Sequence, residues 1–528
     1  MVHRATLNLA DTVRRAVSSG RESLRLPRAS LPHRNRIKKF DDSPNGEYFR
    51  DVLEGHGRVH ASELLRKPED ILKALNGVDL NLRYFDDGGD ISIPAAVNPA
   101  SKYNNKMWTR DTALIGLMLY ELGHTELAVQ IAETLAKTYA RQEERKRFTD
   151  FIFDREPMKK FQSDVKGIPH VMFSIPEGKI HGYNDWSHNQ LDAFGMFLLF
   201  ISRLAKEGKL DLKKLDEKLT RINPDNKKDS TFSIMVQFMD KIQFWENLDV
   251  GPWEDEHGLG PESKRLSSNA LCLSGFTEAG QCFDEIGWDA INMWDANMVK
   301  CLIAKGKEQG EHTLHERVPL DGSYVRETDR HESDAAMVFV LLFAPDLNKN
   351  QKTAILRKLY DQRMTDFGFT RRHRDSYMGS NFVHNPYSEG IFSDVFNPDH
   401  KMAEWTLFDP LLAIYHCREY QKDPQGNREN LPLAIMHYER FQRMVPQEDF
   451  DYVNRFKTEN YDNGTKRVFI SRGTVGEAYF WDGGQRKLNE NSPLQMAVVS
   501  AALMKQELAK ILKLSARLDH SAGILQAS

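Results

Sequence analysis

Four segments of this 528-residue sequence combine aromatic rings with carboxylates, arginine or amides. They span residues 107–112, 186–192, 251–258 and 476–484. Aromatic rings can cover the apolar faces of a pyranose ring, while arginine, carboxylate and amide groups bind its hydroxyls in pairs. The four segments together therefore indicate a sugar-binding pocket.

The first segment places an arginine and a carboxylate at a predicted helix start. Trp108 precedes Arg110 and Asp111, and an aspartate in a first helical turn also complements the positive end of the helix dipole. A capping aspartate in a surface ion pair is the alternative explanation for this segment.

The second segment places an indole before a helix whose first turn is polar. Trp186 precedes His188 and Asp192, which would share one face of a helix at spacing i, i+4. A metal site is disfavoured, because no second histidine or glutamate shares that face. Ordinary polar capping is the alternative here.

The third and fourth segments supply carboxyl groups for acid–base chemistry. Glu254 follows Trp253 directly, and an apolar ring beside a carboxyl group raises its pKa, as a general acid requires. A solvated acidic loop is the alternative for this segment. In the fourth segment, Glu477, Asp482 and the nearby Glu490 are candidates for a second carboxylate, around a predicted hairpin.

In this order the segments resemble glycoside hydrolase family 15, the glucoamylases. Residues 108–111 resemble the family's W-T-R-D segment, whose arginine and aspartate hold the terminal glucose. Residues 186–192 match W-G-x-x-Q-x-D with Ser187 in place of the glycine. Residues 253–254 resemble the Trp-Glu pair that contains the general acid.

Two further segments extend the resemblance. Residues 368–377 are similar to a loop that supplies a sugar-binding arginine, at Arg371 or, as a fallback, at Arg372. His188 and the Glu-Trp-Thr-Leu-Phe run at residues 404–408 are similar to one branch of the family. That branch includes the glucoamylase-like domains of phosphorylase kinase alpha and beta subunits and their bacterial relatives.

The resemblance covers roughly residues 86–514 and implies an all-α fold, an (α/α)6 barrel with short β-hairpins in its loops. It implies inverting hydrolysis at the non-reducing end of an α-glucan or oligosaccharide, with one carboxylic acid, one carboxylate base and no metal or organic cofactor. Glu254 is the expected acid and Glu477 the expected base. The implied sugar-binding residues are Trp108, Arg110, Asp111, Trp186, Asp192, Trp253, Arg371 and Glu404.

The base departs from the family pattern. A gapless match to the fungal members places Gln485 at the position of the base, and a glutamine cannot take a proton from water. Glu477 is the best-placed carboxylate instead, with Glu490 and Asp482 as fallbacks. Without a base, the pocket would bind sugar without turning it over, as in a regulatory module.

A third interpretation is another all-α toroid enzyme, trehalase-like or acting on a uronic acid. The basic cluster that could suit an anionic sugar consists of Arg371, Arg372, His373 and Arg374. A solvated loop with one sugar-binding arginine is the alternative explanation of this cluster.

Helical spacing dominates the chain from residue 109 onward. It predicts helices over residues 109–122, 125–141, 189–205, 233–247, 267–282, 290–305, 334–343, 352–364, 402–421, 430–444 and 493–514. Short strands are expected at 467–470 and 477–481. Spacing alone is compatible with a toroid, a bundle or a solenoid.

Composition limits the remaining possibilities. The net charge of −4 gives no basic field suited to nucleic acid, and the longest apolar run, at 335–344, is too short to cross a bilayer. The four cysteines form no CxxC pair, which favours a reducing compartment, and we expect a cytoplasmic protein. The oligomeric state is open.

The start of the chain differs in composition from the rest. Its first forty residues are rich in arginine and serine and poor in acids, as in an organelle transit peptide or a basic arm. The expected division is a basic segment, an extension packed on the barrel, a catalytic domain and a tail, at residues 1–40, 41–85, 86–515 and 516–528.

Overall fold

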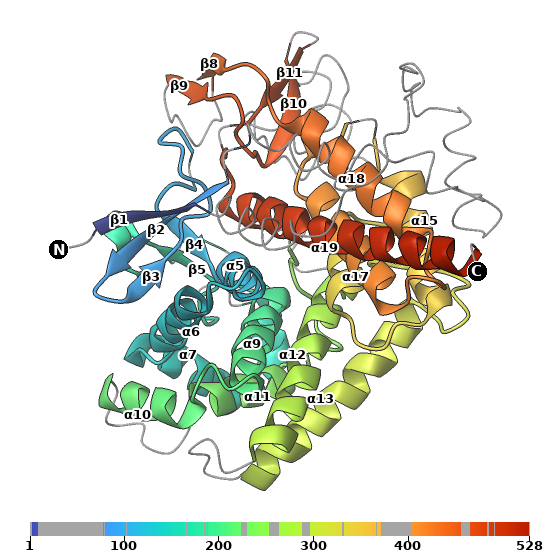
Figure 1. Ribbon diagram of the computed structural model, residues 1–528. Coiled ribbons are helices and arrows are strands. Elements are labelled where there is room, and N and C mark those ends of the chain that lie inside the picture. The colour runs from blue at the N-terminus through green and yellow to red at the C-terminus, as the bar shows by residue number, and fades with distance from the viewer. Residues whose placement is uncertain are drawn as a thin grey trace.

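Helices make up most of the chain that the computed structural model describes, and the strands are short (Figure 1). The described residues are 3–8, 78, 80–101, 103–163, 167–183, 186, 188–222, 230–252, 263–287, 296–329, 332–365, 367–370, 403–455, 465–482, 485–489 and 491–526. The helical content and the absence of a large sheet from these residues confirm the prediction of an all-α fold.

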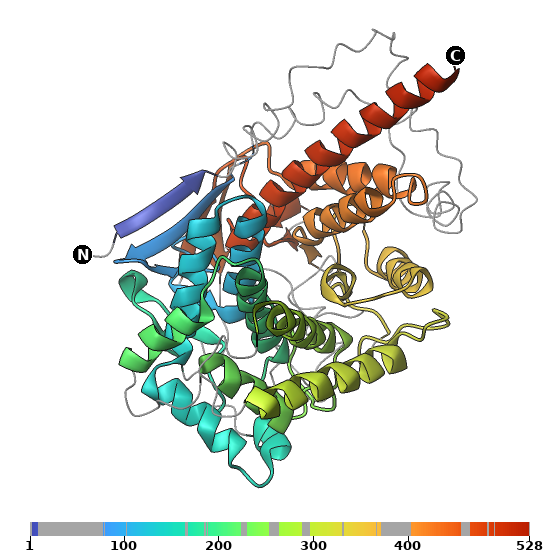
Figure 2. The same cartoon turned by 60° about the horizontal axis from the view of Figure 1, so that its bottom comes forward.

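Six inner helices form a closed ring, in which each helix packs against the next. Around the ring they are α5 (Thr109–Glu121), α9 (Leu191–Lys206), α12 (Leu266–Ile286), α14 (Met337–Phe343), α17 (Phe408–Lys422) and α19 (Gln495–Gln526), and α19 packs back against α5. Figure 2 shows the long α19 extending past the other helices. Each inner helix is followed or preceded in the chain by an outer one, which is the alternation of a toroid of helical hairpins.

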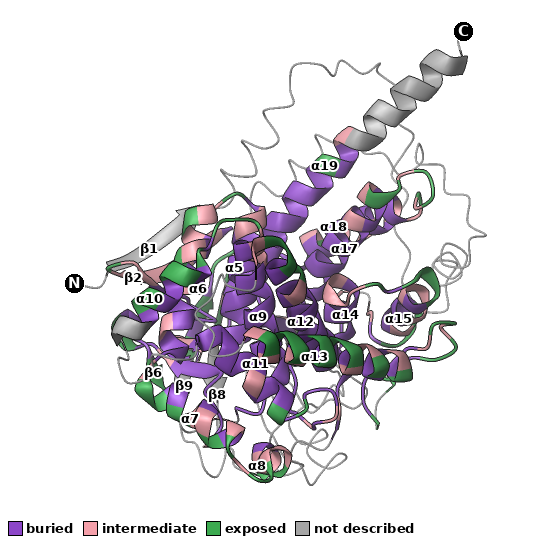
Figure 3. Cartoon of the chain, turned by 90° about the horizontal axis from the view of Figure 1, so that it is seen from below, coloured by how far each residue is buried: buried purple, intermediate pink, exposed green. Residues whose placement is uncertain are grey.

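The outer helices pack on this ring from outside. They are α6 (Thr125–Tyr139), α11 (Thr231–Lys241), α13 (Ala296–Arg317), α15 (Lys349–Gln362) and α18 (Asn430–Met444). Further helices are α7 (Gln142–Ile152), α8 (Pro157–Ser163) and α10 (Leu212–Ile222), with a 3-10 turn, η2, at Pro176–Gly178. Inner helices such as α9 are buried along nearly their whole length, whereas α13 shows an exposed outer side (Figure 3). A helix that is apolar all round requires this internal position.

The strands form small sheets in the connections between helices. The first sheet joins β1 (His3–Asn8), β2 (Asn81–Asp87) and β3 (Asp90–Ser92), and the second joins β4 (Lys106–Trp108), β5 (Met172–Ser174) and β6 (His181–Gly182). The third has the order β11 (Gln485–Leu488), β10 (Ala478–Asp482), β7 (Glu404–Trp405), and a hairpin pairs β8 (Phe450–Arg455) with β9 (Thr465–Ile470). Every neighbouring pair is antiparallel.

Most helix predictions are confirmed in position, and α18 is confirmed at both ends. The helix predicted at 402–421 was wrong at its start, because Glu404 and Trp405 pair with β10 and α17 begins only at Phe408. The helix predicted at 233–247 ends early, at Lys241, shortly before Gln243 turns the chain with a positive φ. Sequence spacing had not predicted α7, α8 or α10.

The two ends of the chain add details to the expected division into segments. Within residues 1–40, His3–Asn8 pairs with Asn81–Asp87 as β1 and β2, and residues 9–77 lie outside the described residues. At the other end α19 continues to Gln526 through most of the expected tail. The targeting role of the first forty residues stays a prediction. None of the described helices is long and apolar enough to cross a membrane.

Close backbone contact between α9 and α12 depends on two glycines. A Cβ atom at Gly275 would lie 2.6 Å from the carbonyl oxygen of Gly195, and one at Gly195 would lie 2.5 Å from the backbone nitrogen of Cys272. Both distances are far below van der Waals contact with rigid backbone. The two most extensively packed inner helices can therefore approach only because these positions carry no side chain.

Replacing Gly275 with alanine should lower the free energy of unfolding by about 1–3 kcal/mol, because overpacking must push α9 and α12 apart. Gly280→Ala on the same helix is the matched control, since its Cβ would meet only Ile303 Cγ2 at 3.5 Å. That variant should gain up to about 1 kcal/mol from helix propensity. Urea denaturation of both variants measures the contrast, and an equal effect of the two substitutions would contradict the packing argument.

Candidate functional site

A buried arginine joins two of the predicted segments. Arg110 in the first turn of α5 donates from Nε to Asp111 Oδ1 at 3.0 Å and from Nη1 to Asp192 Oδ2 on α9 at 2.9 Å. Asp192 is fully buried, and Arg110 and Asp111 are nearly so. A buried guanidinium needs such partners, because desolvation of an unpaired charge costs several kcal/mol, on the order of 3–5 when one partner is removed.

Burial and the neighbouring charges together set the pKa of Asp111. Burial raises the pKa of Asp111, and the Arg110 guanidinium opposes that rise by charge and by its hydrogen bond. Asp192 is nearby and adds a smaller upward contribution. The prediction that Asp192 contacts sugar stays a prediction, and the contact that the structure describes is the one to Arg110.

An aromatic cluster surrounds Trp108, the residue that directly precedes α5. The Trp108 ring contacts Tyr103 and Trp186 edge to face, with ring centroids 4.9 and 5.8 Å apart. Tyr183, Met172 and Ala95 complete the cluster. The buried indole N–H groups of Trp108 and Trp186 have no hydrogen-bond acceptor within the part of the chain that the structure describes. Buried polar groups are normally hydrogen-bonded, so a ligand could supply the acceptors for these two donors.

His188 has a different role from the one its spacing suggested. α9 begins at Leu191, so His188 precedes the helix and shares no helical face with Asp192. Its Nδ1 accepts from the Val171 N–H at 3.3 Å, and its Nε2 lies 2.9 Å from the Tyr183 carbonyl. Burial lowers the pKa of His188 well below its ordinary value. A neutral His188 therefore ties the chain before α9 to β5, since Nδ1 accepts and Nε2 donates.

Glu477, the expected base, is connected to the aromatic cluster through a chain of hydrogen bonds. Its Oε2 accepts from the side-chain amides of Asn489 at 2.5 Å and Asn491 at 2.7 Å. Ser101 donates to the amide oxygen of Asn491 at 2.6 Å and accepts from the Tyr103 N–H at 2.9 Å. Tyr103 in turn contacts Trp108. Glu477 directly precedes β10, and two amides orient its carboxylate.

Glu404 also lies in this region, on the strand next to β10. Its carboxylate accepts from Arg486 Nε at 2.7 Å and Nη2 at 3.3 Å, and from the Thr365 hydroxyl at 2.8 Å. The Arg486 guanidinium stacks on the Phe367 ring, with its central carbon 4.3 Å from the ring centroid. Glu404 is buried, whereas the Arg486 side chain is about one-third exposed. Arg486 is therefore the more exposed partner of this ion pair.

Several predicted residues lie outside the described residues. They are Trp253, Glu254, Arg371, Arg372, His373, Arg374 and Glu490. Asp482 ends β10, with only its backbone described. Gln485, which the gapless match placed at the base position, lies exposed at the first position of β11. In the described part of the chain, no three His, Cys, Asp or Glu side chains are grouped to hold a metal ion.

A buried carboxyl group that was not predicted, that of Asp249, lies at the turn that leads toward Trp253. Its Oδ2 accepts from the Ser268 hydroxyl at 2.7 Å and from the N–H groups of Gly251 and Leu191 at 3.1 and 3.3 Å. Burial raises the pKa of Asp249 to about 7, against the opposing charge of Arg265. Asp249 joins α9, α12 and the turn. No sequence signal marks it, because its burial depends on helices distant in the chain.

Three comparisons place this geometry among known proteins. The model of glycosyl hydrolases family 15 matches residues 93–479, more than half of the chain. Two solved structures, both variants of one glycosidase, match with TM-scores of 0.50 at 14% and 15% identity, over 85% of this chain and 99% of theirs. At that identity the structural likeness shows the fold alone.

Two relatives are known by the name probable phosphorylase b kinase regulatory subunit alpha. The protein from Drosophila melanogaster is 23% identical over 358 residues, 63% of this chain and 25% of its own length. The protein from Caenorhabditis elegans is 21% identical over 348 residues, 62% of this chain and 24% of its own length. The chain thus spans about a quarter of the length of these relatives.

The chain belongs to glycosyl hydrolases family 15. Its closed ring of inner helices is the (α/α)6 toroid that the resemblance implied, so the predicted fold is confirmed. The resemblance to the branch that includes phosphorylase kinase alpha subunits is confirmed as well.

Asp249 gives the site a measurable pH dependence. The pKa of about 7 in the folded protein lies above the ordinary 3.8, so between these values the folded state binds more protons than the unfolded state. Relative to Asp249→Asn, the wild type should therefore lose stability as pH rises from about 4 to 7, with a slope of up to about 1.4 kcal/mol per pH unit.

Urea denaturation across this pH range measures the difference between the two proteins. All other titrating groups are shared, so the difference isolates Asp249. A difference in stability that does not change with pH would show that Asp249 stays ionised throughout. Asp249→Ala is the control for the hydrogen bonds, because it leaves the Ser268 hydroxyl and two N–H groups without their acceptor.

Proposed function

We propose that this chain is an inverting, exo-acting α-glucoside hydrolase of the glucoamylase type, which releases glucose from the non-reducing end of an α-glucan or oligosaccharide. The observation that carries the proposal is Arg110, which is held between two carboxylates and lies two residues after Trp108, the indole that contacts Trp186 edge to face. A fixed guanidinium recognises paired hydroxyls, and indole rings cover the apolar face of a pyranose. Membership of family 15 supports the same chemistry.

The charged groups of the proposed sugar site are held in place before a ligand binds. Asp192 acts through Arg110, whose orientation it fixes, and Asp111 fixes the Nε side of the same guanidinium. The indole N–H groups of Trp108 and Trp186 are candidate donors to the sugar oxygens. Preorganised donors spare the ligand the cost of ordering them, which favours binding.

The proposed reaction uses two carboxyl groups. Glu254 donates a proton to the leaving glycosidic oxygen, and Glu477 takes a proton from the water that attacks the anomeric carbon from the opposite face. Inverting enzymes of this kind place the two carboxyl groups about 6.5–9.5 Å apart. The amides of Asn489 and Asn491 support Glu477 in this role, because they donate to its Oε2 and keep the group a hydrogen-bond acceptor.

The alternative proposal is a catalytically weak or inactive sugar-binding module. Two observations favour it: the names of the two relatives describe regulatory subunits, and the position matched to the fungal base holds the exposed Gln485. In that case the protein binds the end of a glucan through Arg110 and the indoles and does not cleave it.

Glucose release from maltose, isomaltose and maltodextrin distinguishes the two proposals. The hydrolase should release glucose as the β-anomer in NMR, and Glu254→Gln and Glu477→Gln should each lower the rate by about 10²–10⁴-fold, the usual contribution of an acid or base. Asp451→Asn, in an exposed ion pair with Arg467 on the hairpin of β8 and β9, is the control and should keep the wild-type rate. Sugar binding without any release would support the module instead.

The binding part of the proposal has its own test. Arg110→Lys keeps the charge but loses the planar fork, so maltose affinity measured by calorimetry should fall about tenfold or more. Arg203→Lys is the matched control, because Arg203 pairs with Glu278 through two bonds of 2.6 and 2.8 Å at the end of α9. Equal losses of affinity in both variants would contradict a specific role for Arg110.

A further inference from the structure

A tight turn leads from α15 to the residues that pair with β7. The Thr365 hydroxyl accepts from the N–H groups of Phe367 and Gly368, and the Thr365 N–H donates to the Gly368 carbonyl at 2.9 Å. Phe369 and Trp405 exchange two backbone hydrogen bonds directly after it. A Cβ atom at Gly368 would lie 2.8 Å from the Trp405 carbonyl oxygen. The turn thus packs closely against β7, the strand that carries Glu404.

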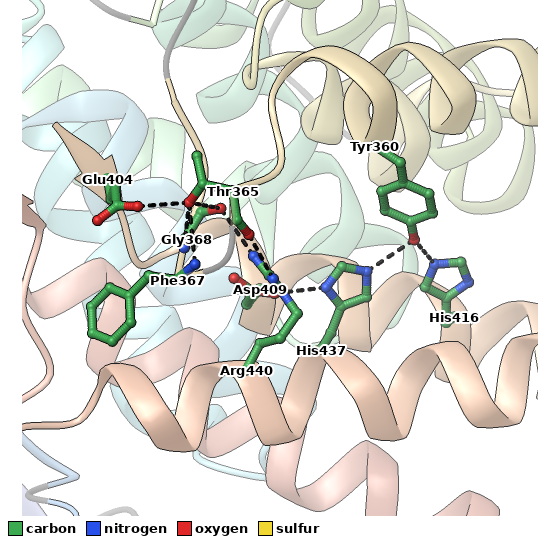
Figure 4. A network of polar contacts seen from close by, with 9 residues as sticks. All are labelled: Tyr360, Thr365, Phe367, Gly368, Glu404, Asp409, His416, His437 and Arg440. Atoms are coloured by element: carbon green, nitrogen blue, oxygen red, sulfur yellow. Dashed lines mark hydrogen bonds and ion pairs between the residues drawn. The ribbon is translucent and has the colours of Figure 1, made fainter. Parts of the chain in front are cut away.

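Arg440 on α18 binds the backbone of this turn. Its guanidinium donates to the carbonyl of Thr365 at 2.8 Å, to the carbonyl of Gly368 at 2.9 Å and to Asp409 Oδ1 at 2.8 Å (Figure 4). Arg440 is one of the largest fully buried side chains of the described chain. A side chain that donates to three acceptors in different directions fixes the turn more rigidly than a single hydrogen bond would.

The anchor of Arg440 is itself supported. His437 Nδ1 lies 2.7 Å from Asp409 Oδ1, and the Tyr360 hydroxyl bridges His437 Nε2 at 2.9 Å and His416 Nε2 at 2.6 Å (Figure 4). Burial lowers the pKa of both histidines, that of His416 to about 3. Both imidazoles are therefore neutral at neutral pH, and the cation that faces Asp409 is Arg440.

The same turn continues to the ion pair on the small sheet. The Thr365 hydroxyl donates to Glu404 Oε1, Glu404 binds Arg486 through two bonds, and Arg486 stacks on Phe367 of the turn. Arg486 lies on β11, which pairs with the strand that begins directly after Glu477. A continuous series of contacts thus connects α18 with the partly exposed Arg486 guanidinium. Arg486 lies on the small sheet next to Glu477, the expected base.

We propose that Arg440 and Thr365 are positioning residues, and that the guanidinium they position, Arg486, is a second arginine contact for the glucan. Arg440 fixes the turn, and the Thr365 hydroxyl of that turn fixes the Glu404 carboxylate through its hydrogen bond. Glu404 in turn orients Arg486 toward the sugar hydroxyls. The proposal rests on the proposed function in that the ligand is the same glucan. It adds residues that no sequence motif indicated.

Thr365→Val is the sharpest variant, because it removes one hydroxyl and keeps the size of the side chain. It should speed hydrogen exchange in peptides covering residues 367–370 and 485–488, and weaken maltose binding about tenfold, the effect of losing one hydrogen bond to a charged group. Thr138→Val on α6, whose hydroxyl donates to the Thr134 carbonyl of its own helix, is the matched control. It should change neither readout.

A second comparison separates positioning from general destabilisation. In the double variant of Thr365→Val with Arg486→Lys, maltose affinity should fall no further than in Arg486→Lys alone, because both changes remove the same contact. Additive losses, or unchanged affinity in Thr365→Val despite faster exchange, would overturn the proposal. Arg440→Lys should speed hydrogen exchange more in these two peptides than in any other. Equally faster exchange in all peptides would contradict the positioning role of Arg440.

The two proposals fail in different ways. If the wild type binds no maltose, the proposed function fails, while exchange in residues 367–370 and 485–488 still decides whether Thr365 and Arg440 position the ion pair. Wild-type exchange rates in both variants would overturn that part. If the wild type binds maltose and Arg486→Lys binds it equally well, the proposed function stands and the second arginine contact is wrong.

Discussion

The site depends on one electrostatic constraint, the burial of the Arg110 guanidinium between Asp111 and Asp192. A buried charge is tolerated only with partners of fixed geometry. These partners come from α5 and α9, two neighbours in the inner ring, so the ion pairs also fix how those helices begin. The result is an arginine of fixed orientation two residues after Trp108, the centre of the aromatic cluster.

A second buried arginine, on the opposite part of the ring, also has partners of fixed geometry. Arg440 is buried because Asp409 and two carbonyl groups accept its hydrogen bonds, and these contacts hold the turn that supports Glu404. In both places carboxylate partners fix the orientation of a buried guanidinium.

Much of the fold was predictable, because helical spacing marks helices such as α5 and α18 locally, and Gly123 marks the end of α5. The start of α17 was not, since Glu404 pairs with a strand more than seventy positions away in the chain. The same division holds for the site. Trp108, Arg110 and Asp111 form a motif in sequence, whereas Asp249, Arg440 and Arg486 acquire their roles only through burial and through partners on other elements.

The most direct test of this account is a crystal structure of the protein with bound glucose. We expect a glucose ring against Trp108 and Trp186, with two adjacent hydroxyls bound by the Arg110 guanidinium while its bonds to Asp111 and Asp192 persist. Glucose bound elsewhere, with the Arg110 cluster intact and no sugar against the indoles, would contradict the central claim.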